Sequence, residues 1–204
     1  MLLFQQIDPR TFTYRVDHRG RLVAVNDAWL AFAAENDWPV SRRDVLDRPL
    51  MDSIADEHLR YLYGLLMARL RAGSGPLRFH FRCDAPDARR HMEMLMLYDK
   101  GEREIELQCK VLRIERRAPQ ELLRADHPTD EQRLDVCSCC KRVDLGGQWR
   151  EVEDAVIWLR VFDRQHPPRT RHCVCPTCAE DLSRLAHAGP SGHGPESSAR
   201  EANS

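Results

Sequence analysis

The chain has 204 residues, of which 31 are Lys or Arg and 32 are Asp or Glu, so its formal net charge is -1. A charge this close to zero argues against a protein that coats nucleic acid or binds membranes through a polybasic surface. No apolar run approaches the roughly 20 residues that span a bilayer, and the first residues lack the pattern of a secretory signal. The sequence therefore predicts a cytoplasmic protein of one or two globular domains with no membrane partner.

The N-terminal segment predicts a β-hairpin followed by a capped helix. Short alternating runs over 12–16 and 22–25 flank Asp17-His18-Arg19-Gly20, which is a turn sequence. Asn26 is a suitable N-cap for a helix over 27–36, and Trp38-Pro39 ends that helix.

The next segment predicts one long helix and three strands. Apolar residues recur with i, i+3, i+4, i+7 spacing over 57–70, and alternating runs follow at 79–83, 92–96 and 105–111. The alternation slips at Leu112, which predicts a bulge or a strand end. We therefore expect an α+β domain with an antiparallel five-stranded sheet and flanking helices on one face.

Two segments carry a resemblance to a known family. Residues 16–29 read VDHRGRLVAVNDAW and residues 45–50 read VLDRPL, within the order ββ-helices-βββ. This pattern resembles the PAS domain, whose opening often reads D-x-x-G-x-I-x-x-x-N-x-A; Asp47 stands where the family usually has Gly. The resemblance covers residues 10–117 and implies a sensor domain that receives a small-molecule ligand or a partner protein.

Candidates for the wall of a ligand pocket in this domain are Trp29, His58, Tyr61, Phe81 and Met94. His58 lies where haem-binding PAS proteins carry an iron ligand, but a single His at a helix start is more often solvated, so haem is not expected. Flavin photochemistry is not expected either, because the reactive-cysteine motif of light-sensing PAS domains is absent.

Six of the eight cysteines form two clusters. Cys137/Cys140 and Cys175/Cys178 are C-x2-C pairs, and two such turns can place four thiolates around one tetrahedral ion. We therefore predict a small four-cysteine module over 137–186 that holds structural zinc, with rubredoxin-like iron left open. Alternative metal or redox residues are Cys139, His172 and Cys173.

This module resembles the zinc-ribbon or treble-clef-like appendage of bacterial PAS-containing signalling proteins. The matching positions are Cys137, Cys140, Lys141, Trp149, Glu151, His172, Cys175, Pro176 and Cys178, and the chain departs at Cys173, where that pattern has Gly. Residues 118–136 contain Pro119 and Pro128 and are mainly acidic, which predicts a linker. Residues 187–204, rich in Gly, Pro and Ser, predict a disordered tail.

The sequence contains no G-x-S-x-G, P-loop, H-E-x-x-H or G-x-G-x-x-G motif, so we expect no enzyme. It predicts a cytoplasmic sensor or adaptor of bacterial signal transduction that couples a PAS-like domain to a zinc-stabilised protein-interaction module. Two alternatives stay open, a zinc-dependent transcriptional regulator that binds DNA and a thiol/zinc redox sensor. Residues 137–186 carry only 8 basic and 7 acidic residues, which disfavours nucleic acid as the partner. A homodimer is also left open.

Overall fold

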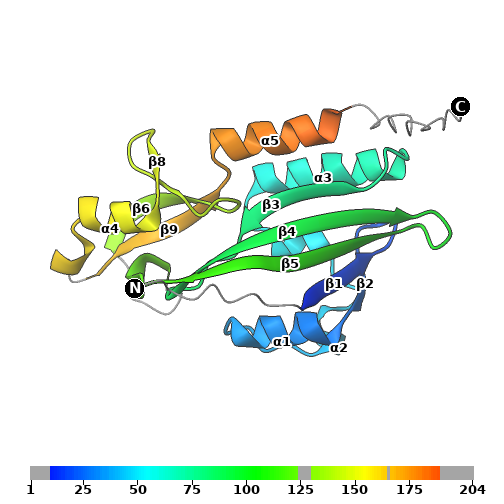
Figure 1. Cartoon of the computed structure of the whole chain (residues 1–204), viewed down its shortest axis with the longest axis horizontal. Helices are drawn as coiled ribbons and strands as arrows, with labels where there is room; N and C mark the ends of the chain where they lie inside the picture. Colours follow the sequence, from blue (N-terminus) through cyan, green and yellow to red (C-terminus); the bar gives the residue numbers. More distant parts are fainter. Residues whose placement is uncertain (1–9, 124–129, 165, 189–204) are drawn as a thin grey trace, which may run out of the picture.

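The structure, a computed structural model, describes residues 10–123, 130–164 and 166–188. Its first unit is built on an antiparallel five-stranded sheet in the order β2-β1-β5-β4-β3 (Figure 1). The predicted α+β class and the order ββ-helices-βββ are confirmed. The strands are β1 (Thr11–Val16), β2 (Leu22–Val25), β3 (Leu77–Arg82), β4 (Ala88–Asp99) and β5 (Glu104–Arg116). The helices between β2 and β3 are α1 (Asp27–Glu35), α2 (Arg42–Val45), the 3-10 helix η1 (Leu50–Ser53) and α3 (Glu57–Arg71).

The predicted helix cap at Asn26 and the predicted bulge near Leu112 are both present in the structure. The Asn26 side chain accepts from the backbone N–H of Trp29 at 2.8 Å and of Thr13 at 3.1 Å, so one residue caps α1 and ties it to β1. The predicted bulge is also present. Met92 pairs with Val111 and His91 with Arg113, which leaves Leu112 as the extra residue of β5.

One face of the sheet forms the main core. The fully buried side chains of the strands alternate with polar residues that point to the other face, as in Ile105 and Leu107 beside Glu104 and Glu106. α1 and α3 pack on the apolar face, and they contribute Phe32 of α1, stacked on Phe12, and a stripe on α3. The stripe consists of Leu59, Leu62, Tyr63, Leu66 and Leu70.

The second unit is a four-stranded sheet in the order β8-β7-β6-β9 with its own small core. Its elements are η2 (Glu121–Leu123), β6 (Asp130–Cys137), β7 (Val143–Asp144), β8 (Trp149–Arg150), α4 (Val152–Trp158), η3 (Val161–Asp163), β9 (Pro168–Cys173) and α5 (Pro176–His187). β6 and β9 run parallel and bring Cys137 beside Cys173. No helix among these described segments has the length and apolar character needed to cross a membrane.

The predicted linker over 118–136 is shorter in the structure, because residues 130–137 form β6 and Leu122 is buried in the second core. The sequence carries little signal for this strand, because residues 131–133 are exposed and the buried positions, Leu134, Val136 and Cys137, are confined to its second half. Residues 124–129 lie outside the described residues. The predicted disordered tail lies outside them as well, apart from His187, which ends α5, and Ala188.

The two units are packed directly against each other. α5 lies along α3 (Figure 1), Leu182 joins the core of the first unit, and Arg69 donates to the carbonyl of Leu185. At the other end of the contact, the backbone N–H of Arg82, the last residue of β3, donates to the Cys139 carbonyl at 2.7 Å.

Buried ion pairs reinforce this contact. Arg82 is 9% exposed and pairs with Asp84, which is fully buried, and with Glu151 of the second unit at 2.6 Å. Arg117 pairs with Asp84 at 3.1 Å and with Glu153 at 2.8 Å. Hydrogen bonds from Arg82 hold the pKa of the Glu151 carboxyl below its usual range against the opposing effect of burial, which is the largest single influence on it. The network therefore holds both units in one arrangement.

Arg82→Met should destabilise the folded protein by about 3 kcal/mol, because it removes one partner from a buried charge network and leaves Asp84 with a single guanidinium. Urea unfolding followed by circular dichroism measures this change. Arg78→Met on the same strand is the matched control. Arg78 pairs with Glu93 at 2.5 Å but is 57% exposed, so its loss should cost at most about 1 kcal/mol. Equal costs for the two variants would contradict the structural role of the network.

Candidate functional site

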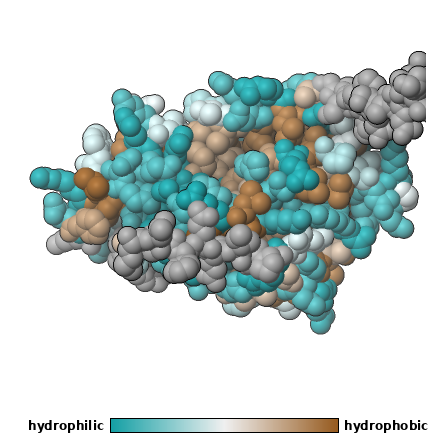
Figure 2. Space-filling model, viewed as in Figure 1, coloured by the Kyte–Doolittle hydropathy of each residue, from teal (hydrophilic) through white to brown (hydrophobic). Residues whose placement is uncertain are grey.

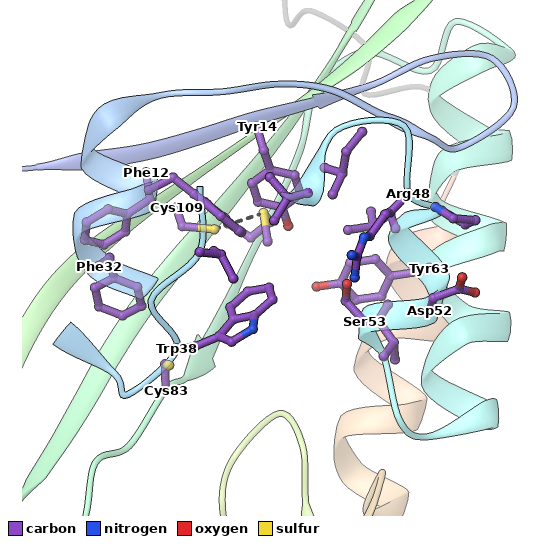
Figure 3. Close-up of a pocket in the computed structure, with 18 of the residues that line it drawn as sticks. Phe12, Tyr14, Phe32, Trp38, Arg48, Asp52, Ser53, Tyr63, Cys83 and Cys109 are labelled. Carbon is purple, nitrogen blue, oxygen red and sulfur yellow. Dashed lines mark hydrogen bonds between the residues drawn. The ribbon is translucent and has the colours of Figure 1, made fainter. Parts of the chain in front are cut away.

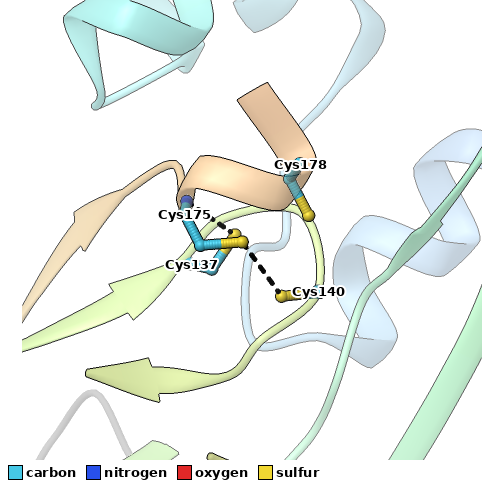
Figure 4. A group of neighbouring side chains, drawn as sticks. All are labelled: Cys137, Cys140, Cys175 and Cys178. Atoms are coloured by element: carbon cyan, nitrogen blue, oxygen red, sulfur yellow. Dashed lines mark hydrogen bonds between the residues drawn. The ribbon is translucent and has the colours of Figure 1, made fainter. Parts of the chain in front are cut away.

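The second unit brings four cysteines together at the contact with the first unit. Cys137 ends β6, Cys140 follows in the next turn, and Cys175 and Cys178 begin α5 (Figure 4). The four sulfurs all lie within 4.8 Å of one another, and the sulfurs of Cys140 and Cys175 are 3.8 Å apart. A tetrahedral ion with metal–sulfur bonds of about 2.3 Å separates its ligands by about 3.8 Å. The four cysteines are therefore positioned to hold a metal ion.

The backbone of the 137–142 turn has the form that a metal-binding turn needs. The N–H of Cys137 donates to the Arg142 carbonyl at 2.8 Å, and the N–H of Lys141 donates to the Cys137 carbonyl at 2.9 Å. Lys141 adopts a left-handed conformation with φ of 61°, the position at which Gly follows the cysteine pair in rubredoxin-like turns. A left-handed turn therefore forms here although the residue is not Gly.

The surroundings of the four thiols stabilise one of them, Cys137, as a thiolate. The backbone N–H of Cys175 donates to the Cys137 sulfur at 3.3 Å, and Cys178 lies in the first turn of α5, at the positive end of its dipole. Hydrogen bonds from the neighbouring thiols, Cys139 first, lower the pKa of Cys137. The hydrogen bond to Cys137 in turn raises the pKa of Cys140. The surrounding donors thus stabilise the Cys137 thiolate without the help of a metal ion.

The three alternative metal or redox residues lie at different distances from this cluster. Cys139 is next to it, and hydrogen bonding with Cys137 raises the pKa of the Cys139 thiol to about 12. Cys173 belongs to β9, and its thiol points to the Val136 carbonyl 3.8 Å away. His172 is exposed overall, and its pKa is lowered because nearby protein atoms displace part of the water around its ring and because Lys141 is close. Cys173 and His172 are not part of the group of four.

The first unit encloses a cavity of about 790 Å³ between the sheet, α1, the α2–η1 segment and α3 (Figure 3). Aromatic rings and sulfur atoms make up most of its wall, and charged groups stand at its edge. The aromatic lining residues are Phe12, Tyr14, Trp29, Phe32, Trp38, Tyr63 and Phe81, and the sulfur-bearing ones are Cys83, Met92, Met94 and Cys109. Burial raises the pKa of the Cys109 thiol to about 12, so this thiol is a neutral part of the wall.

Three of the five predicted pocket residues, Trp29, Phe81 and Met94, line the cavity. His58 and Tyr61 do not. Both are exposed on the outer side of α3, and Tyr61 is 62% exposed. The reason is helical phase, because the apolar stripe of α3 faces the sheet and places Tyr63 in the cavity wall. Haem ligation by His58 therefore has no geometric support.

Sequence reasoning missed several residues of the cavity. Tyr63 carried a signal, since it belongs to the stripe that predicted α3. Tyr14 also carried one, because it shares the inward phase of β1 with Phe12 and Val16. Trp38 and Arg48 carried none, because each stands in an irregular segment whose side-chain direction depends on the tertiary fold.

Comparisons with known proteins find a likeness among solved structures alone. No protein-family model matches the chain, and no curated protein does. Among solved structures, the PAS domain from Bordetella pertussis BvgS matches with a TM-score of 0.38 and 20% sequence identity, over 52% of this chain and 79% of that chain.

Cys137→Ser should abolish tight metal binding, because it removes one ligand of a closed set and the N–H···S hydrogen bond that supports it. Titration with Co²⁺ as a spectroscopic probe measures the change through the visible absorption of tetrahedral thiolate-bound cobalt. Cys173→Ser is the matched control and should keep the full spectrum, since its thiol lies outside the group of four. If Cys173→Ser loses the spectrum and Cys137→Ser retains it, the ligand set is wrong.

Proposed function

We propose that the chain is a non-enzymatic sensor of bacterial signal transduction. In this proposal the cavity of the first unit receives a small molecule, and the four-cysteine unit, stabilised by zinc, presents a surface to a partner protein. The two units communicate through the contact centred on Arg82. The PAS-like order of elements in the first unit supports the sensing role, and the cytoplasm is the compartment that the reduced cysteine clusters favour.

The observation that carries this proposal is the position of β3 between the two sites. Phe81 and Cys83 line the cavity, and Arg82 between them is bonded to the Cys139 carbonyl and to Glu151. Cys139 stands inside the 137–140 turn that supplies two of the four cysteines. A ligand that moves Phe81 or Cys83 therefore also moves Arg82 and changes its contacts with the cysteine unit. Two arrangements with different contacts between the units are what a two-state signal requires.

Zinc is the ion that fits the donor set best. Four thiolates in a closed tetrahedron are typical of structural zinc, which leaves no open position for substrate. Zinc requires no redox partner, and its binding energy would add to the folding energy of a unit whose own core is small. The residues that would hold it are Cys137, Cys140, Cys175 and Cys178.

The partner surface of this proposal is the exposed end of α4 and the following turn. Ile157, Trp158 and Phe162 are 73%, 67% and 77% exposed, and Figure 2 shows apolar side chains at the end of the molecule that carries these elements. Large apolar side chains, Trp above all, supply most of the binding energy when they are buried at protein interfaces. Arg160, between Trp158 and Phe162, is also largely exposed and adds a charged group to the surface.

Trp158→Ser combined with Phe162→Ser should reduce capture of the partner at least ten-fold while zinc content and the unfolding midpoint stay unchanged, because Trp158 is 67% and Phe162 77% exposed. The measurement is crosslinking and quantitative affinity purification from the native cells, together with elemental analysis that expects one zinc per chain. The matched control is Tyr61→Ser, another exposed aromatic residue, on α3. Unchanged capture by the double variant would reject this surface.

A second candidate function, an oxidant sensor, is favoured by the position of Cys139 beside the four cysteines. In this candidate, hydrogen peroxide oxidises the thiols of Cys139 and Cys178 to a disulfide, is itself reduced to two water molecules, and releases the ion. Cys139→Ser should then retain zinc under peroxide concentrations that deplete the wild type. Equal zinc loss from both proteins, measured with a chromogenic chelator, would reject the sensor.

The DNA-binding alternative has weaker support. The outward face of β6 and β9 carries Arg133, Arg169 and Arg171, but Arg171 is held by Asp135 at 2.6 and 2.5 Å. Arg133 and Arg169 have no ion pair with any residue in 10–123, 130–164 or 166–188, and two arginines neutralise few phosphates.

A further inference from the structure

The polar groups inside the cavity restrict what it can bind. The hydroxyls of Tyr14, from β1, and Tyr63, from α3, point into the cavity from two sides (Figure 3). Neither hydroxyl has a hydrogen-bond partner among the described residues. Both hydroxyls are accessible from the cavity, since neither is among the fully buried side-chain atoms that lack a partner in the described part of the chain. A hydroxyl that faces a cavity and has no protein partner is free to bond to a ligand or to water.

The two hydroxyls act as hydrogen-bond donors. Burial, the main cause, raises the pKa of both tyrosines, and the proximity of Tyr63 raises that of Tyr14 further. Both groups therefore keep their protons at neutral pH, and Figure 3 shows that they point into the same cavity. A single carbonyl oxygen has two lone pairs and can accept from both hydroxyls at once.

The remaining wall favours flat, uncharged molecules. Tyr14 and Trp29 form an edge-to-face pair with ring centroids 6.5 Å apart, and Trp29 and Trp38 form another at 5.6 Å. Such rings, with the thioethers of Met92 and Met94, stack well on another aromatic ring.

The charges of the cavity lie at its edge. Among the described lining residues, the charged ones are Asp44, Arg48 and Asp52, and all three are exposed. The one cation is thus outnumbered by two carboxylates. The Arg48 side chain is directed toward Tyr63 (Figure 3) but is exposed, so its charge is screened by solvent. An anionic ligand would therefore lose its hydration for one screened cation beside two carboxylates, which is costly.

We infer that the cavity selects a neutral, flat aromatic molecule whose carbonyl oxygen accepts hydrogen bonds from both Tyr14 and Tyr63. This inference rests on the proposed function, in which the cavity is the ligand site, and it adds the chemical class of the ligand.

Three naphthalene derivatives of nearly equal shape test the inference by isothermal titration calorimetry on the full chain. They are 2-acetylnaphthalene, which carries the carbonyl; 2-isopropenylnaphthalene, in which a methylene group replaces the oxygen; and naphthalene-2-carboxylate, which carries a charge. The ketone should bind at least ten-fold more tightly than either of the others, because only the ketone is a neutral acceptor. Tyr14→Phe and Tyr63→Phe should each weaken ketone binding by about five-fold to ten-fold.

Tyr61→Phe is the matched control, because this tyrosine lies on the same helix as Tyr63 but is exposed, and its variant should bind the ketone as the wild type does. Equal binding of the ketone and the hydrocarbon, or unchanged binding by both cavity variants, overturns the ligand class and leaves the cavity a ligand site. Tighter binding of the carboxylate also overturns it, as does the absence of binding by all three probes.

The proposed function fails by a different measurement. Met94→Trp fills the cavity, and under the proposed function it should alter partner capture whatever the ligand is. Unchanged capture by this variant would reject sensing through the cavity, while the comparison of the three probes judges the ligand class alone.

Discussion

The arrangement of this molecule depends on the buried charge network around Arg82. The Arg82 guanidinium lies between Asp84 of its own unit and Glu151 of the other. The backbone N–H of Arg82 donates to the Cys139 carbonyl. Charges that are taken out of water are tolerated only when they are paired with good geometry, so the network specifies one way of packing the two units. An apolar contact would permit the two units to slide over each other. Here a relative shift of the units would separate a buried carboxylate from its arginine. The network thus contributes specificity of arrangement more than net stability.

This constraint explains why the metal cluster and the cavity share one neighbourhood. Residues 137–140 form the turn that supplies two of the four clustered cysteines, and Cys139 within it is bonded to the end of β3. The other two cysteines stand at the start of α5, which packs along α3, the helix that carries Tyr63. The cysteine unit therefore contacts two walls of the cavity, one through β3 and one through α3. Under the proposed function, these two contacts would transmit a change in the distance between sheet and helix, which is the distance that a ligand between them would set.

Most of the first unit could be predicted from the sequence because its signals are local. Alternation of apolar residues marks a strand, an i, i+3, i+4, i+7 stripe marks a helix, and Asn26 marks the start of α1, each without knowledge of the rest of the chain. The four clustered cysteines were predictable for the same reason, since C-x2-C spacing is a local property. β6 was not, because a strand with two inward apolar residues has almost no periodic signal, and its pairing with β9 joins segments more than 30 residues apart.

The two tyrosines of α3 show where sequence reasoning reaches its limit. Tyr61 and Tyr63 are two residues apart, a rotation of about 200° around a helix, so they point to nearly opposite sides. The apolar stripe already determined which of them faces the sheet, and a prediction that followed the stripe would have chosen Tyr63. The stripe does not predict that a cavity lies in front of Tyr63. Trp29 and Trp38 line that space and form an edge-to-face pair, and Trp38 lies in a segment with no periodic pattern. A cavity forms where side chains from distant segments do not fill the space between them, so no local sequence pattern predicts it.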